Sequence, residues 1–167
     1  MALTANIKDA VTATLTNTAD FESASSSIAD ATSITFTDGT GAGQADRIFK
    51  DQRTLGASAT EDLDLSGALT NIYGTTVVFA RIKYIRVSAA AANTNNVNVA
   101  RATANGVPLF LAALDAIPVR PGGFFSWGCS DATGIPVTAG TGDLLTITNS
   151  GGTTGVTYNI TIIGASA

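Results

Sequence analysis

The sequence predicts an all-β protein, built as an antiparallel β-sandwich that carries an N-terminal arm. Short runs that alternate apolar and polar residues recur along the 167 residues, and Gly- or Asn-rich turns separate them. No long amphipathic helix lies between these runs, which argues against a parallel α/β sheet. The hydrophobic fraction is 45%, so a chain of this length has enough apolar material for a packed core.

Residues 1–32 are poor in large apolar side chains and rich in Ala, Thr and Ser. Residues 11–16 alternate apolar residues with threonines, which is typical of a strand. Residues 21–31, which follow a candidate helix cap at Asp20, are consistent with either a short helix or a loose linker. The low hydrophobic content indicates an arm or accessory strand that becomes ordered against a neighbour. The predicted sandwich domain covers residues 33–167.

The first half of the predicted sandwich begins with short strands. Residues 34–37 alternate apolar residues with threonines, and the sequence DGTGAG at 38–43 predicts a loop. Residues 47–55 are a weaker strand candidate, and residues 62–65 alternate aspartate with leucine. The run 77–87 (VVFARIKYIRV) predicts the longest strand, central in its sheet. Its apolar residues change phase, so we expect a bulge near residues 80–81 or a strand covered on both faces.

The second half contains turns, a cluster of aromatic residues and a final strand. Residues 93–96 predict a turn, and the Asn-Gly pair at 105–106 predicts a tight hairpin. Residues 107–117 are ambiguous between a strand and one or two helical turns. Prolines bracket an extended piece at 118–121 that is poorly suited to the centre of a sheet. Residues 156–163 show the clearest alternation, with apolar residues at the even positions.

The aromatic residues Phe124, Phe125 and Trp127 follow a Gly-Gly turn. We expect most of this cluster to lie in the core. Neighbouring residues of a strand face opposite sides, so either Phe124 or Phe125 must point outward as a candidate interface anchor. The eight or nine predicted strands favour two antiparallel sheets with jelly-roll-like connections.

The charge and hydropathy patterns restrict the partners. The net charge of −4 and pI of about 4.5 argue against direct nucleic-acid binding. The basic residues Arg81, Lys83, Arg86 and Arg101 are expected to line a solvated strand face. No apolar run is long enough for a transmembrane helix, and the first residues do not resemble a secretory signal. We therefore expect a soluble protein made in a cytoplasm.

The side chains that most enzymes need are scarce. The chain has no histidine, which excludes Ser-His and Cys-His nucleophile systems. The single cysteine, Cys129, cannot form an internal disulfide, and we expect it to be a small buried apolar residue. The loop DGTGAG lacks the Gly-Lys-Ser/Thr ending of a phosphate-binding loop. The sequence therefore predicts neither an enzyme nor a bound cofactor.

Acidic residues offer the only alternatives to this prediction. Two of the carboxylates Glu61, Asp62, Asp64 and Asp143 could in principle serve glycoside hydrolysis, but the chain has few aromatic residues to line a cleft. Oxygen atoms of Glu61, Asp62, Asp64 or the Asp38 turn could bind calcium, but no spacing matches a calcium loop. We expect these carboxylates to be solvated strand and turn residues.

The order of several sequence blocks resembles that of small structural proteins encoded among the head genes of tailed bacteriophages. The blocks are FTDGTGAGQADRIFKDQRTLGASATEDLDLSG (36–67), VVFARIKYIRV (77–87), VRPGGFFSW (119–127), VTAGTGDLLTITNSG (137–151) and TYNITIIGASA (158–167). The resemblance implies a decoration, or cement, protein with a β-sandwich fold on the exterior of a virion capsid. Its expected partners are the major capsid protein and itself, as a homotrimer. The alternative is a tail, neck or fibre component, possibly one that binds glycans.

The first 30 or so residues lie outside the resemblance and are expected to grip the capsid. The large apolar residues of the arm and the exposed part of the aromatic cluster are the candidates for contact with the capsid or another subunit. They are Val11, Leu15, Phe21, Ile28, Phe124 and Trp127.

Overall fold

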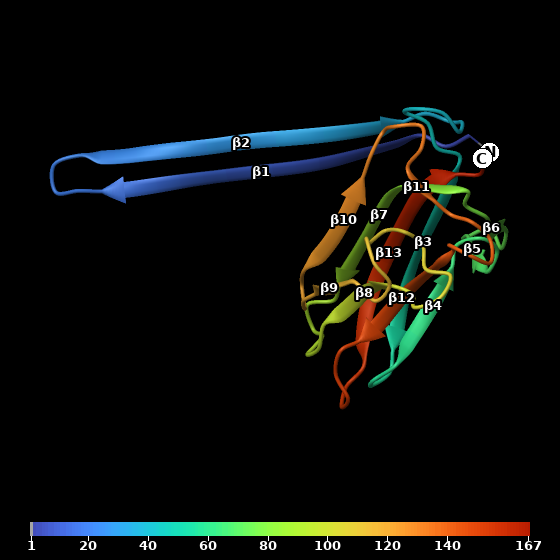
Figure 1. Cartoon of the computed structure of the whole chain (residues 1–167). Coiled ribbons are helices and arrows are strands. Elements are labelled where there is room, and N and C mark those ends of the chain that lie inside the picture. Colours follow the sequence, from blue (N-terminus) through green and yellow to red (C-terminus); the bar gives the residue numbers. More distant parts are fainter. Residues whose placement is uncertain (1) are drawn as a thin grey trace.

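The computed structural model describes residues 2–167, and these residues form strands and turns without any helix. Figure 1 shows a long two-stranded hairpin that projects from one end of a rounded β-body. The strands are β1 (Ala5–Thr18), β2 (Ser23–Phe36), β3 (Arg47–Leu55), β4 (Thr60–Asp64), β5 (Leu69–Thr70), β6 (Thr76–Val77), β7 (Arg81–Ala89), β8 (Val97–Arg101), β9 (Ala116–Val119), β10 (Phe124–Gly128), β11 (Ile135–Pro136), β12 (Leu144–Asn149) and β13 (Val156–Ala165). The prediction of an all-β, antiparallel protein is confirmed.

The hairpin of β1 and β2, called the arm below, pairs over 14 positions, from Ala5 opposite Phe36 to Thr18 opposite Ser23. A rise of about 3.4 Å per residue makes the arm roughly 48 Å long. The prediction of a short helix or loose linker at residues 21–31 is wrong, because most of that stretch belongs to β2. Its Ser- and Ala-rich sequence has little strand pattern of its own, and pairing with β1 supplies the hydrogen bonds. The boundary predicted after residue 32 falls within β2.

The body consists of two antiparallel sheets and a small β5–β6 ribbon. One sheet has the strand order β10-β7-β13-β3, with β11 also paired to β7, and the other has the order β4-β12-β8-β9. The eight main body strands can be numbered 1 to 8 along the chain, leaving out β5, β6 and β11. The strand orders of the two sheets then become 6-3-8-1 and 2-7-4-5. The chain therefore crosses between the sheets at most of its connections, which holds the two layers together.

The main core lies between these two sheets, and β13 contributes to it as its alternation predicts. Val156, Tyr158, Ile160 and Ile162 are buried, whereas the residues between them lie on the outer face. β7 lies between β10 and β13, so the prediction that it is central in its sheet is confirmed.

The phase change in β7 comes from a bulge at Lys83. Ile163 of β13 lies opposite Tyr84, but Gly164 lies opposite Ile82, which leaves Lys83 as the extra residue. The expectation that Lys83 is solvated is wrong, because its side chain is completely buried. The Nζ atom donates hydrogen bonds to the carbonyl oxygens of Gly41, at 3.1 Å, and Asp131. Burial lowers the pKa of Lys83.

A second, smaller core on the other face of the β7 sheet joins the arm to the body. Its buried members come from the end of β2, the following loop, β7 and β13, and the first residues of the arm pack against them. The buried residues are Phe36, Ala45, Tyr84 and Ile163, and the partly buried ones are Leu3, Ala5, Ile7 and Ile34. We call this cluster the arm root.

The segment between β8 and β9 differs from its prediction. Asn105 has a positive φ of 56°, but no tight hairpin forms at 105–106, because the chain loops on to residue 115 before β9 begins. The Asn105 carbonyl instead accepts hydrogen bonds from the amides of Asp143 and Leu144. Strand β9 contains Pro118 and lies at an edge of its sheet, as the prolines predicted.

Candidate functional site

The carboxylates considered for catalysis or calcium binding are used in hydrogen bonds within the protein. Glu61 accepts hydrogen bonds from Arg53, at 2.8 Å, and from the Tyr158 hydroxyl, at 2.6 Å. The pKa of Tyr158 is raised mainly by burial and, to a smaller extent, by its hydrogen bond to Glu61. Asp62 accepts a hydrogen bond from Thr146. These contacts tie β4 to its neighbours in both sheets.

The remaining acidic candidates stabilise loops. The Ser66 hydroxyl oxygen lies 2.8 Å from Asp64 Oδ1 and 2.7 Å from Asp143 Oδ2, so the two carboxylates share its one proton. Asp38 accepts a hydrogen bond from the amide of Leu3. Within residues 2–167, no group of three or more His, Cys, Asp and Glu side chains is arranged to hold a metal ion. Cys129 is a free, partly buried thiol rather than a fully buried one, and desolvation raises its pKa.

The arm has one mostly apolar face, which also carries Asp9 and Asp30, opposite Thr32 and Val11. Side chains directly opposite each other in an antiparallel pair lie on the same side. Ile7 therefore faces the same way as Ile34, and the pair Ala13–Ile28 continues this face between Val11 and Leu15. We call this side the arm face. Val11 and Ile28 are exposed and Leu15 is 75% exposed, so the apolar strip continues uncovered beyond the root.

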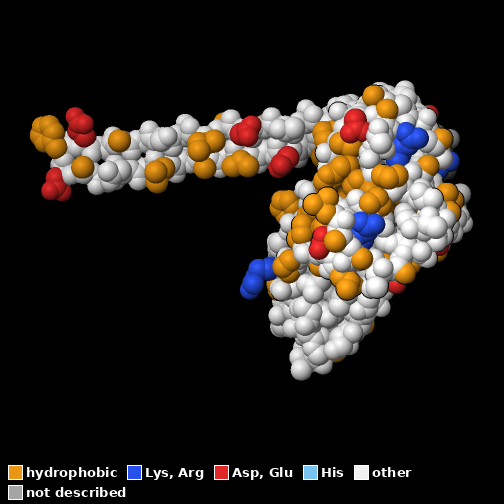
Figure 2. Space-filling model, viewed as in Figure 1, with side chains coloured by type: hydrophobic (Ala, Val, Ile, Leu, Met, Phe, Trp, Pro, Cys, Tyr) orange, Lys and Arg blue, Asp and Glu red, His pale blue; other side chains and the backbone are white. Residues whose placement is uncertain are grey.

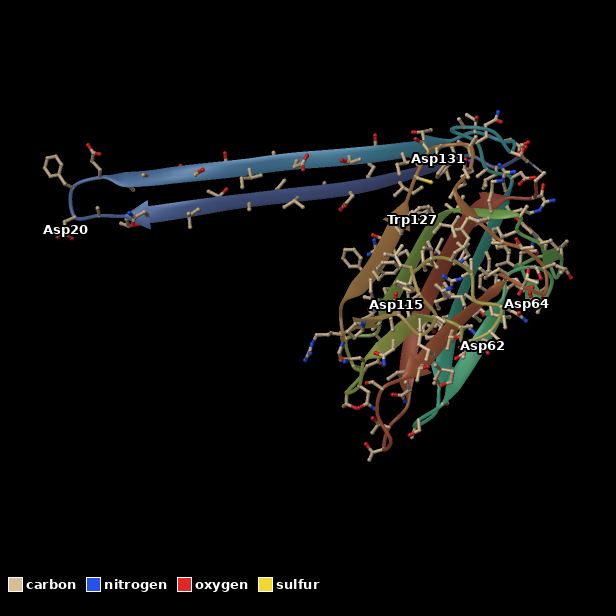
Figure 3. The ribbon with its side chains drawn as sticks, in the orientation of Figure 1. Asp20, Asp62, Asp64, Asp115, Trp127 and Asp131 are labelled. Carbon is tan, nitrogen blue, oxygen red and sulfur yellow. The ribbon has the colours of Figure 1, made fainter. Side chains whose placement is uncertain are left out.

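The opposite side of the arm is polar and the tip is aromatic. Thr12, Thr14 and Thr16 alternate with the apolar residues of β1 and face serines and Ala29 of β2. The turn at the tip is closed by a hydrogen bond from the Ala19 amide to the Glu22 carbonyl. Phe21, in this turn, is 98% exposed. Figure 3 shows Asp20 at this tip, far from the body.

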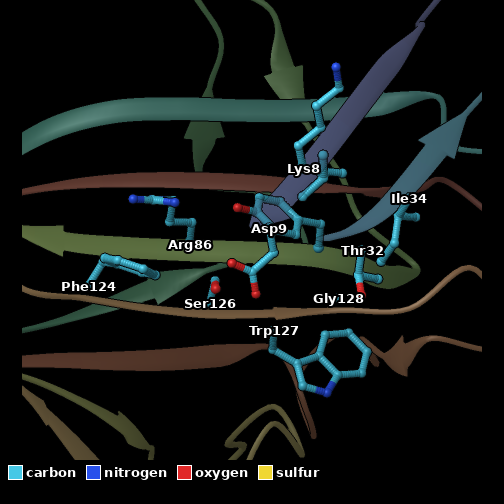
Figure 4. Close-up of a pocket in the computed structure, with 11 residues that line it drawn as sticks. Lys8, Asp9, Thr32, Ile34, Arg86, Phe124, Ser126, Trp127 and Gly128 are labelled. Carbon is cyan, nitrogen blue, oxygen red and sulfur yellow. The ribbon is translucent and has the colours of Figure 1, made fainter. Parts of the chain in front are cut away.

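A shallow pocket of about 260 Å³ lies between the arm and the body, where β1 and β2 pass over β7 and β10. In Figure 4 Asp9 points into this pocket and Lys8 points away from it. The guanidinium carbon of Arg86 lies 4.1 Å from the centre of the Phe124 ring, a distance typical of a cation–π contact. The pocket is therefore both charged and aromatic.

The aromatic cluster is divided between the core and the surface. Phe124 is 56% exposed, whereas Phe125 packs towards the core with its ring centre 6.0 Å from that of Phe110. Phe124 is thus the outward-pointing residue that strand alternation required. Trp127 is partly buried against the main core and also lines the pocket at the arm root.

Three exposed apolar residues near β9 were missed by the sequence reasoning. Leu111 is 99% exposed, and Leu114 and Ile117 are also exposed. With Phe124 we call them the body patch. Their signal was the apolar run 107–117, whose ambiguous period does not reveal that its side chains point outward. Figure 2 shows hydrophobic side chains along the arm and in the angle between the arm and the body.

The structure therefore places the predicted interface residues in two groups. Val11, Leu15 and Ile28 share the arm face and Phe21 occupies the tip, whereas Phe124 and Trp127 belong to β10. Phe124 and Trp127 line the pocket together with Ile7 and Ile34 of the arm, whereas the predicted arm residues lie further out along the hairpin.

Comparisons of the chain with protein-family models, with curated proteins and with solved structures found no match. Among the described residues, no helix has the length and apolar character needed to cross a membrane.

Proposed function

We propose that this chain is a non-enzymatic structural protein of a phage virion that binds and stabilises the capsid from outside. The arm is the observation that carries the proposal. The arm is a hairpin of 14 residue pairs, and only its root packs on the body. Isolated two-stranded hairpins are only marginally stable in water. An exposed apolar strip on such a hairpin is best explained by a neighbour that covers it.

The topology of the body supports the same function. The strand orders 6-3-8-1 and 2-7-4-5 are those expected of a jelly roll, and we infer that fold for the body. Jelly rolls are common in viral capsid and lectin domains, so the topology agrees with a virion role by analogy of fold.

The proposed arrangement has the major capsid protein as the main partner. The arm lies on the capsid and the body stands on its outer surface, while copies around a local three-fold axis form a trimer. The protein is made in the host cytoplasm before assembly. Attachment through several arms at once raises the overall affinity without requiring each arm to bind tightly.

The copy number of the chain in purified particles tests the proposal. Quantitative mass spectrometry should find it in an amount comparable to the major capsid protein. A number that fits only one or two rings would place the chain in the neck, tail or fibre instead. Absence from the particle would overturn the virion role.

A truncated arm tests the proposed contact. Residues 9–32 can be replaced by an Asn-Gly turn, because Lys8 and Ser33 lie opposite each other in the hairpin. This variant keeps the arm root, so the body should fold normally, and capsid binding should be lost. Thr14→Ala, on the polar side of the arm, is the matched control that should bind normally. Full binding by the truncated chain would show that the arm is not the capsid contact.

A further inference from the structure

β10 has an unpaired edge. The Ala89 amide bonds to the Gly123 carbonyl, and the Cys129 amide bonds to the Lys83 carbonyl, which shows that the odd-numbered residues face β7. Because antiparallel ladders alternate, the amides and carbonyls of Phe124, Ser126 and Gly128 turn away from β7. β10 is the last strand of its sheet, and these three residues are exposed. An edge of this kind is a template for an added strand.

The body patch lies beside this edge. The contact between Phe110 and Phe125 places the loop 107–115 against β10, and Leu111 and Leu114 project from that loop. Arg101 holds the loop by donating hydrogen bonds to the carbonyls of Phe110 and Leu111. The free edge and the apolar patch therefore form one surface, which suits a strand with an apolar side.

The arm of a second copy has the required properties. Its two strands pair only with each other, so each has an outer row of unpaired backbone groups, and the arm face supplies the apolar side. The arm of the same copy projects away from the body and from β9 (Figure 1), so its outer part does not reach this surface.

The charges on the two surfaces are also complementary. Beyond Lys8, every charged residue of the arm is acidic. Around the body patch the charges are mainly basic, and the one carboxylate of the loop, Asp115, already accepts a hydrogen bond from the Ala112 amide. The acidic residues are Asp9, Asp20, Glu22 and Asp30, and the basic ones are Arg86, Arg101 and Arg120.

We propose that the arm of a second copy of this chain adds to the free edge of β10, with its arm face covering the body patch. Ten residue pairs of arm beyond the root give a strip roughly 34 Å long and 10 Å wide, from the rise and spacing of strands. Covering one strip removes about 700 Å² from the two surfaces together. In a ring of copies each subunit gives one arm and receives another, so each subunit takes part in two such contacts, which together bury about 1,400 Å².

Self-association of the full chain tests this inference. Sedimentation velocity over a concentration series should show an oligomer. Leu15→Asp should raise its dissociation constant roughly tenfold or more, because it removes an apolar side chain from the covered strip and places a carboxylate against the apolar residues of the body patch. Thr14→Asp adds the same charge on the polar side of the arm and should leave the constant nearly unchanged. Both positions are exposed and distant from the body, so both variants should fold.

Cross-linking between copies tests the docking site itself. In a Cys129→Ala background, chains with Leu15→Cys are mixed with differently tagged chains with Leu111→Cys, and disulfides between the two tags are measured. We expect these disulfides to form faster than with Thr14→Cys, the matched control. A monomer at about 0.1 mM, where a standard interface should form, would overturn the inference. So would equal rates for the two cysteine positions.

This inference does not rest on the proposed virion role, but it assigns the arm face to a second copy rather than to the capsid, so the two tests separate these occupants. A chain that is monomeric but present in particles would refute arm exchange and leave capsid binding intact, with a capsid strand as the occupant of the β10 edge. A chain that exchanges arms but is absent from particles would do the reverse.

Discussion

Replacing Ile160 with alanine should lower the free energy of unfolding by about 3–4 kcal/mol. Ile160 has no exposed surface and lies in β13 between Val87 of β7 and Asp51 of β3. The change removes three carbon atoms, which is worth roughly 2.4 kcal/mol at about 0.8 kcal/mol for each buried group. The strands on both sides are held by ladders of hydrogen bonds, so the site cannot collapse, and the remaining cavity accounts for the rest.

Urea unfolding measures this loss as a shift of the midpoint at an unchanged slope. Thr161→Ala is the matched control, because Thr161 is the next residue of the same strand and lies on the outer face, where a change of about 0.5 kcal/mol or less is expected. Equal losses at the two positions, or a loss below about 1 kcal/mol for Ile160→Ala, would refute the assignment of the inner face.

Three further substitutions test other features of the body. Gly164→Ala should lower the free energy of unfolding, measured by thermal melting, by about 1–3 kcal/mol or more. The reason is that the added Cβ would lie 2.2 Å from the Arg81 carbonyl oxygen. Gly67→Ala is the control that should leave the stability nearly unchanged, because no atom lies within 4 Å of its added Cβ. Because the pKa of Tyr158 is raised in the folded protein, its contribution to stability is complete below the usual tyrosine pKa of about 10 and decreases as the pH rises above it. Between about pH 9 and 11, the free energy of unfolding of Tyr158→Phe should therefore fall less than that of the unchanged protein. Because the pKa of Lys83 is lowered in the folded protein, the unfolded chain binds more protons as the pH approaches the ordinary value of 10.5 from below. The free energy of unfolding should therefore rise with pH relative to that of Lys83→Met. A constant difference between the two free energies from about pH 7 to 10 would contradict this.

The parts of the fold that the sequence predicts are those with a local period. The alternation in residues 156–163 indicates the inner face of β13 because each side chain's environment follows from its parity. Residues 23–33, which form most of β2, have no such pattern, and their conformation depends on pairing with β1, so they could be mistaken for a helix or linker. The burial of Lys83 depends on a bulge that only the register with β13 reveals.

The candidate interface shows the same limit. Val11 and Leu15 have the same parity in one strand, so their common face can be predicted from the sequence. Ile28 joins them only through the register of the hairpin, which places it opposite Ala13. Leu111 and Leu114 belong to an irregular loop, where no period relates sequence position to exposure. Non-local pairing and loop geometry therefore account for what the sequence did not predict.

The arm root determines where the tip of the arm can go. The arm is roughly 48 Å long, so a rotation of only about 5° at the root moves the tip by about 4 Å, close to the spacing between neighbouring strands. The packing of Phe36 and Ile34 against Tyr84 and Ile163 therefore sets the direction in which the whole arm projects. Loss of a single methyl group from this cluster would therefore change the position of the arm tip more than it changes the stability of the body.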